Sequence, residues 1–123
     1  MIADKSTQTV FLVDDDEFVR DSLAALLEAY DFKVEAFSCG RDFLAAHNGE
    51  GCLLLDIHMP GLSGLDVLKK LRTDRQTTPV ILITGRRDHM IEEQAKALGA
   101  VALLDKPVPH TALLAALRQA LPA

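Results

Sequence analysis

Five short apolar runs, separated by stretches with helical periodicity, constrain the fold of this chain more than any other feature. The runs are rich in β-branched residues or leucine and occupy residues 9–13, 33–37, 52–57, 79–84 and 100–104. Four of them are nearly continuous, which is typical of strands covered on both faces, whereas residues 33–37 alternate and are expected towards an edge. Strands that alternate with helices favour a parallel sheet with helices on both faces and right-handed crossovers.

The segments that follow these runs carry apolar residues at helical spacing. Ser63 is expected to be an N-cap, Gly99 suits a C′ position, and Pro109 suits a first helical turn. The weakest helical pattern covers residues 40–47. The other four stripes are Leu23, Leu26, Leu27 and Tyr30; Leu65, Leu68 and Leu71; Ile91, Ala95 and Leu98; and Leu114, Leu117 and Leu121.

The length and charge of the chain limit the classes of function. At 123 residues it has the size of one ordinary domain, so we expect a single domain over residues 1–123. A formal net charge of −5 argues against a nucleic-acid-binding surface. The apolar runs are too short to span a membrane. Two sparse cysteines and no signal peptide indicate a reducing, cytoplasmic setting.

Polar side chains of three chemical kinds follow four of the predicted strands. They are the acidic run 14–16, then Asp56, Thr84 and Lys106. In an open α/β sheet, ligands bind outside the carboxyl ends of the strands, so we expect these residues to meet. Crowded carboxylates repel one another, but Mg²⁺ prefers oxygen ligands and takes carboxylates together with phosphate oxygens. Carboxylates, a hydroxyl and an ammonium together indicate a site for phosphoryl transfer.

Four stretches carry a resemblance to a known family: "VFLVDDDEFVRDSL", "LLLDIHMPGLSGLDVL", "TPVILITG" and "ALGAVALLDKP". On these stretches the chain resembles the receiver domain of two-component response regulators over essentially its whole length. It is most similar to FixJ-like receivers, which are often joined to a LuxR-type helix-turn-helix output. The resemblance implies a flavodoxin-like (CheY-like) fold with five helices and a five-stranded parallel sheet in the order 2-1-3-4-5.

The resemblance also implies how the acidic residues act. Asp56 would accept a phosphoryl group from the phosphohistidine of a sensor histidine kinase. Asp14 and Asp15 would hold Mg²⁺, with Asp56 and the backbone carbonyl of His58 as further ligands. His58 and Arg86 occupy variable positions that flank the site and, in the family, tune the lifetime of the phosphate.

Two further roles follow from the same resemblance. Thr84 would be the switch hydroxyl that moves towards the phosphoryl group, and Lys106 would pair with Asp56 or its phosphate. The family often has a cis peptide bond before the proline at position 107. Leu103 departs from the family, which usually has Tyr or Phe there, so the aromatic part of the relay is missing.

The resemblance implies that the chain is a phosphorylation-dependent switch. It would catalyse its own phosphorylation and dephosphorylation and no other reaction. The face built from the fourth helix, fifth strand and fifth helix would control a homodimer or a DNA-binding output domain outside this chain. A stand-alone receiver that shuttles phosphoryl groups is an alternative. A Mg²⁺-dependent phosphatase with an Asp nucleophile usually has a second Asp where this chain has His58. A flavin-binding domain would need a Ser/Thr/Gly-rich loop where this chain has acid.

The remaining acidic, histidine and sulfur-containing residues are expected to have structural positions outside the site. Asp16 and Glu17 are expected to open a helix, where negative charge is favourable. Cys52 is interpreted as a core residue, and Met59 and Met90 as packing residues. Surface or helix-end positions are expected for Cys39, His47, His89 and His110.

Overall fold

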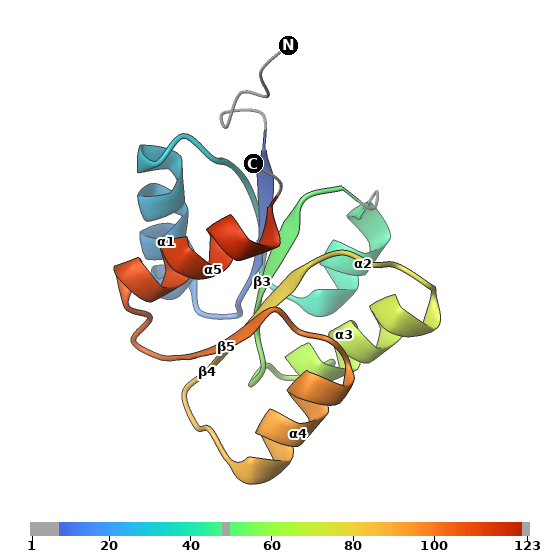
Figure 1. Ribbon diagram of the computed structural model, residues 1–123. Helices are drawn as coiled ribbons and strands as arrows, with labels where there is room; N and C mark the ends of the chain where they lie inside the picture. The colour runs from blue at the N-terminus through green and yellow to red at the C-terminus, as the bar shows by residue number, and fades with distance from the viewer. Residues whose placement is uncertain (1–7, 48–49, 122–123) are drawn as a thin grey trace.

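Strands and helices alternate along the whole described part of the protein (Figure 1). The computed structural model describes residues 8–47 and 50–121. The strands are β1 (Thr9–Val13), β2 (Lys33–Phe37), β3 (Cys52–Asp56), β4 (Val80–Thr84) and β5 (Ala102–Asp105). The helices are α1 (Glu17–Ala29), α2 (Gly40–Ala46), α3 (Gly64–Thr73), α4 (His89–Ala97) and α5 (His110–Ala120).

The five strands form one parallel sheet in the order β2-β1-β3-β4-β5, which confirms the expected topology. Strand β2, the alternating run, lies at one edge as predicted. Strand β5 lies at the other edge and begins at Ala102, two residues later than the run 100–104. Leu103 packs against the core on one face of the sheet and Ala102 and Leu104 against the core on the other, but all three stay partly exposed at this edge, so the coverage of β5 is incomplete.

Both faces of the sheet are covered by helices, which explains the continuous apolar runs. In β1, Val10 and Leu12 pack with the α1 and α5 side chains, whereas Phe11 and Val13 pack with those of α2, α3 and α4. Figure 1 shows the same division, with α1 and α5 together on one side of the sheet. Cys52 belongs to the α1–α5 side, and burial raises the pKa of its thiol to about 12, which confirms that it is a core residue.

Local side-chain hydrogen bonds fix where the helices begin. Ser63 and Asp66 form a reciprocal capping box at the start of α3, which confirms Ser63 as the N-cap. Asp88 caps α4 by accepting a hydrogen bond from the Ile91 N–H at 2.8 Å. Gly99 follows α4 with a φ of 73°, a conformation that glycine adopts at no steric cost.

Helix α4 has a small apolar anchor on the sheet. Its two buried side chains are Ile91 and Ala95, and the neighbouring Met90 is 69% exposed. The interpretation of Met90 as a packing residue is wrong, because Met90 lies about 100° around the helix from Ile91 and faces solvent. The anchor of α4 is therefore one isoleucine and one alanine, whereas α3 buries Val67, Leu68 and Leu71.

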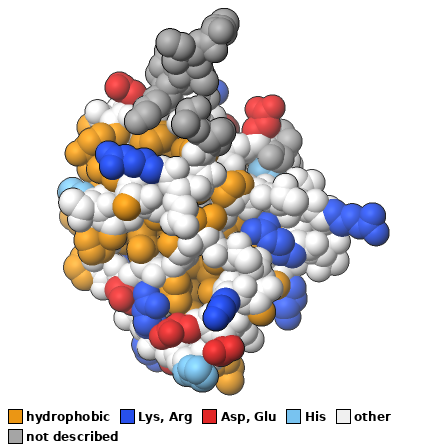
Figure 2. All heavy atoms as spheres, viewed as in Figure 1, with side chains coloured by type: hydrophobic (Ala, Val, Ile, Leu, Met, Phe, Trp, Pro, Cys, Tyr) orange, Lys and Arg blue, Asp and Glu red, His pale blue; other side chains and the backbone are white. Residues whose placement is uncertain are grey.

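The surface is unevenly polar on the side that Figure 2 displays. Hydrophobic side chains gather over α5 and β5, and charged side chains surround α4 below them. Among the described helices, none combines the length and the apolar character needed to cross a membrane.

Candidate functional site

Three carboxylates meet at the carboxyl edge of the sheet. Asp14 follows β1 and is 1% exposed, Asp56 ends β3 and is 2% exposed, and Asp15 is exposed. One oxygen from each of the three lies within 4.8 Å of the others. The structure thus brings together the acidic residues that the sequence placed at two different strand ends. Three hard oxygen donors at this spacing fit a divalent cation such as Mg²⁺.

The turn after β1 orients Asp14 towards this cluster and Asp16 away from it. The backbone N–H of Asp16 donates to Asp14 Oδ1 at 2.9 Å, and Arg20 Nη1 donates to the Asp14 carbonyl at 2.8 Å. The Asp16 carboxylate instead accepts hydrogen bonds from the N–H groups of Phe18 and Val19. The interpretation of Asp16 as a helix cap is confirmed.

Lys106 places its ammonium between the two buried carboxylates. Its Nζ lies 2.9 Å from Asp14 Oδ2 and 3.4 Å from Asp56 Oδ1. Among the described residues, the Lys106 ammonium is the one partner of the buried Asp14 Oδ2, so this charged contact alone compensates its burial there. Burial by itself would lower the pKa of Lys106, but the hydrogen bond and charge of Asp14, followed by those of Asp56, outweigh it and raise that pKa. The peptide bond between Lys106 and Pro107 is cis, as the resemblance implied.

Asp56 is the carboxyl group whose ionisation the site opposes most clearly. Burial, and then the negative charge of Asp14, raise its pKa from 3.8 to about 6. The charge of Lys106 and the His58 N–H, which donates to Asp56 Oδ1 at 3.3 Å, lower the pKa of Asp56, but their effect is smaller than that of burial and Asp14. The cluster therefore has an excess of negative charge that a bound cation would relieve.

Thr84 and His58 are joined directly by their side chains. Thr84 ends β4, is fully buried, and its Oγ1 accepts a hydrogen bond from the Arg86 N–H at 3.0 Å. His58 Nε2 lies 2.8 Å from the same Oγ1. The sequence predicted both residues near the site but gave no signal for this contact, because it depends on the paths of two loops and on a ring rotamer.

Leu103 and Arg87 connect the loop after β4 to the edge strand. Leu103 is partly buried and packs against the apolar cluster on the α2–α4 side. Arg87 donates from Nη2 to the Leu103 carbonyl and from Nε to Asp105 Oδ1 at 3.1 Å. Sequence reasoning missed Arg87, since nothing in its neighbourhood distinguishes it from a solvated arginine.

Gly64 lets α3 begin directly against the end of β3. A Cβ atom at this position would lie 2.3 Å from the Asp56 carbonyl oxygen and 2.8 Å from the Ile57 Cα. The Gly64 N–H donates to the Ile57 carbonyl at 2.9 Å. The turn before α3 therefore leads directly into the helix, and the close approach fixes the backbone that carries Asp56.

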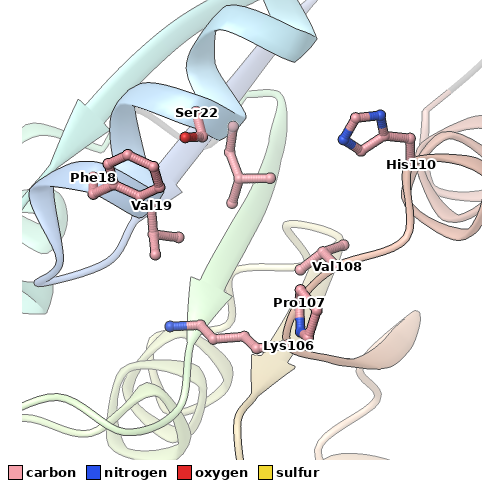
Figure 3. A pocket seen from close by; sticks show the side chains of 8 residues that line it. Phe18, Val19, Ser22, Lys106, Pro107, Val108 and His110 are labelled. Carbon is pink, nitrogen blue, oxygen red and sulfur yellow. The ribbon is translucent and has the colours of Figure 1, made fainter.

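A groove of about 440 Å³ lies beside the carboxylate cluster, between α1 and the segment that joins β5 to α5 (Figure 3). Phe18, Val19 and Ser22 line it from α1, and Pro107 and Val108 face them. Lys106 also lines it, and Phe18 is 79% exposed. The groove therefore offers apolar contact surface next to a residue of the charged site.

The fold and the site define a class of protein. The chain belongs to the family of response regulator receiver domains, whose family model matches residues 10–118. It is thus a receiver domain of two-component response regulators, as the sequence stretches implied.

Individual relatives agree with this assignment. The chain is 38% identical over 120 residues to the transcriptional regulatory protein FixJ of Bradyrhizobium diazoefficiens, covering 93% of this chain and 58% of the relative. It is 40% identical over 114 residues to FixJ of Azorhizobium caulinodans, covering 91% and 54%. The chain therefore spans little more than half the length of these relatives.

Solved structures agree with the fold. The response regulator StyR superposes with a TM-score of 0.88 at 40% identity, covering 93% of this chain and 59% of that one. The structure described as FixJ-N gives a TM-score of 0.83 at 33% identity, covering 95% of this chain and 98% of that one. These likenesses confirm the CheY-like sheet order and helix count.

Proposed function

We propose that Asp56 is the residue that accepts the phosphoryl group, and that Asp14 and Asp15 hold Mg²⁺ beside it. One observation carries the proposal: three carboxylate oxygens lie within 4.8 Å of one another, and the Lys106 ammonium contacts the two buried ones. Such a set supplies the positioning and the charge neutralisation that phosphoryl transfer requires. A flavin-binding site would need a Ser/Thr/Gly-rich phosphate loop after β1, where this chain has three aspartates.

The contacts of Asp56 indicate which oxygen reacts. Oδ1 receives the His58 N–H and faces Lys106, whereas Oδ2 has no hydrogen bond to another described residue. We expect Oδ2 to attack the phosphorus of a phosphohistidine. A P–O bond forms as the P–N bond breaks, and the electron pair stays on the imidazole nitrogen, which takes a proton from solvent. A pKa of about 6 leaves Asp56 ionised, and hence nucleophilic, at neutral pH.

The neighbouring residues have separate tasks in this proposal. Bound Mg²⁺ supplies charge neutralisation for the phosphoryl oxygens, and the backbone carbonyl of His58 remains a predicted ligand. Lys106, which already contacts Asp56, offers its ammonium to the phosphoryl group. The Thr84 hydroxyl is expected to donate to a phosphoryl oxygen and so to move the loop that follows β4.

The groove between α1 and the β5–α5 segment is proposed as the place where a sensor histidine kinase presents its phosphohistidine. Lys106 lines the groove, and Phe18, which also lines it, is largely exposed. Exposed aromatic rings supply much of the binding energy at protein interfaces. Because such kinases act on receivers in the same compartment, we expect the chain to act in the cytoplasm.

The output surface is proposed to be the face of α4, β5 and α5. Strand β5 is an edge strand with partly exposed apolar residues, and hydrophobic side chains gather over β5 and α5 in Figure 2. Phosphorylation at Asp56 would bias this face towards a homodimer or towards an output domain. We propose that residues 1–123 form one receiver domain of a regulator whose output binds DNA; the similar FixJ proteins are transcriptional regulatory proteins.

Phosphorylation of the isolated chain tests the assignment. Incubation with Mg²⁺ and acetyl phosphate should add one phosphoryl group, detected by intact mass. Asp56→Asn and EDTA should each abolish the addition, and Asp15→Ala should weaken Mg²⁺ binding. Labelling that survives Asp56→Asn would remove Asp56 from this role.

A matched control separates this effect from a general loss of acidity. Asp21 is an exposed carboxylate on α1 outside the cluster, so Asp21→Asn should leave labelling unchanged. Equal losses in Asp21→Asn and Asp56→Asn would contradict the proposal.

A further inference from the structure

We infer that His58 is a positioning residue that restrains the switch: its imidazole accepts the hydroxyl proton of Thr84 and competes for it with the phosphoryl group on Asp56. The inference rests on the proposed function. It gives the His58 side chain a role in the conformational equilibrium, in addition to the backbone carbonyl predicted as a Mg²⁺ ligand.

The hydrogen bonds of Thr84 define this competition. Arg86 N–H donates to Oγ1 at 3.0 Å and so occupies a lone pair of the hydroxyl oxygen. His58 Nε2, at 2.8 Å, is the second partner among the described residues. With the ring proton on Nδ1, Nε2 is an acceptor for the hydroxyl proton. A hydroxyl has a single proton, so Thr84 cannot donate to the imidazole and to a phosphoryl oxygen at the same time.

The position of His58 makes the imidazole an effective competitor. Its backbone N–H is tied to Asp56 Oδ1 at 3.3 Å, and its ring reaches across to the end of β4. One residue therefore contacts both the proposed phospho-acceptor and the proposed switch residue. The His58 side chain is exposed, so the released ring can turn to water without leaving a cavity.

The energetic consequence is a bias towards the unphosphorylated arrangement. Release of Thr84 costs the hydrogen bond to His58, and a hydrogen bond of this kind has a modest net value in proteins. Removing the imidazole should therefore favour the switched state. We expect the apparent affinity for beryllofluoride, a phosphoryl analogue, to rise about fivefold, which corresponds to about 1 kcal/mol at 1.4 kcal/mol per tenfold.

A double-mutant cycle tests whether His58 acts through Thr84. The apparent affinity for beryllofluoride in the presence of Mg²⁺ is measured by NMR titration for the wild type, His58→Ala and His58→Gln. Alanine should tighten binding about fivefold, whereas glutamine, which retains an acceptor, should stay near the wild type. In a Thr84→Val background, His58→Ala should have no effect.

The outcomes separate this inference from the proposed function. Equal affinities for the wild type and His58→Ala, or the same gain in the Thr84→Val background, would overturn the role of His58 and leave Asp56 untouched. A wild-type chain that binds no beryllofluoride would overturn both.

The ¹⁵N chemical shift of the His58 ring provides a second test, because a merely structural role of His58 would not require this shift to change on activation. In the free protein the ¹⁵N shift of His58 Nε2 should be that of an acceptor nitrogen, and it should change when beryllofluoride is added. A protonated Nε2 in the free protein would refute the competition, because the Thr84 proton would then be free for the phosphoryl group.

Discussion

Replacing Asp56 with asparagine is expected to stabilise the fold in the absence of Mg²⁺, because it removes a charge that burial and Asp14 oppose. The pKa of Asp56 rises from 3.8 to about 6, and roughly two pKa units correspond to about 3 kcal/mol. The exposed Asp15 opens the cluster to water, which screens the repulsion. We therefore expect the free energy of unfolding to rise by about 1–2 kcal/mol at neutral pH.

The pH dependence of this gain has a definite sign. Below the unfolded value of 3.8, Asp56 is protonated in both states and the penalty is absent. As the pH rises to about 6 the unfolded chain ionises first, so the wild type loses stability relative to Asp56→Asn, and the difference is constant above that value. Urea unfolding of both proteins across this range, in EDTA, measures the difference.

Mg²⁺ and a second variant serve as controls for the same experiment. Adding Mg²⁺ should shrink the advantage of Asp56→Asn, because a cation that binds the folded wild type stabilises it by mass action. Asp21→Asn, which removes an exposed carboxylate, should change stability little at any pH. A gain in Asp56→Asn that does not vary with pH would refute the electrostatic reasoning and indicate a packing effect.

Two further predictions concern the framework of the site. Gly64→Ala should lower the free energy of unfolding by about 2 kcal/mol in urea titrations, because its Cβ would lie 2.3 Å from the Asp56 carbonyl oxygen; unchanged stability would contradict the close approach. The His47 ring stacks on Phe43 and forms a hydrogen bond with Thr78 Oγ1, and burial lowers its pKa. Because the unfolded chain then binds a proton more readily than the folded one, the folded state loses stability as the pH falls through 6.5. His47→Gln should flatten this acid loss in thermal melts, and identical pH profiles would count against it.

The strand-end residues were predictable because the sheet itself brings them together. Once the apolar runs are read as parallel strands, the carboxyl ends of β1, β3 and β4 must share an edge, and Asp14, Asp56 and Thr84 follow. Their residue types then limit the chemistry. The helix count and the role of Asp16 as a cap were confirmed because each depends on local patterns, whereas the strand order was predicted from the family resemblance.

Contacts that depend on side-chain rotamers and loop paths were not predictable. His58 and Thr84 are far apart in the sequence, and no periodicity relates them. Lys106 lies closer to Asp14, at 2.9 Å, than to Asp56, at 3.4 Å. A difference of this size depends on the side-chain rotamer of Lys106, which the sequence does not specify. Met90 was misassigned because hydrophobicity alone does not say on which side of a short helix a residue lies.

The small anchor of α4 has a consequence for how a signal can travel. With Ile91 and Ala95 as its buried side chains, α4 has less apolar surface to expose than α3 when it detaches from the sheet. Its amide protons should therefore exchange with solvent through local opening well before those of α3. A receiver built this way can move α4, which belongs to the proposed output surface, at low free-energy cost while the rest of the sheet keeps its packing.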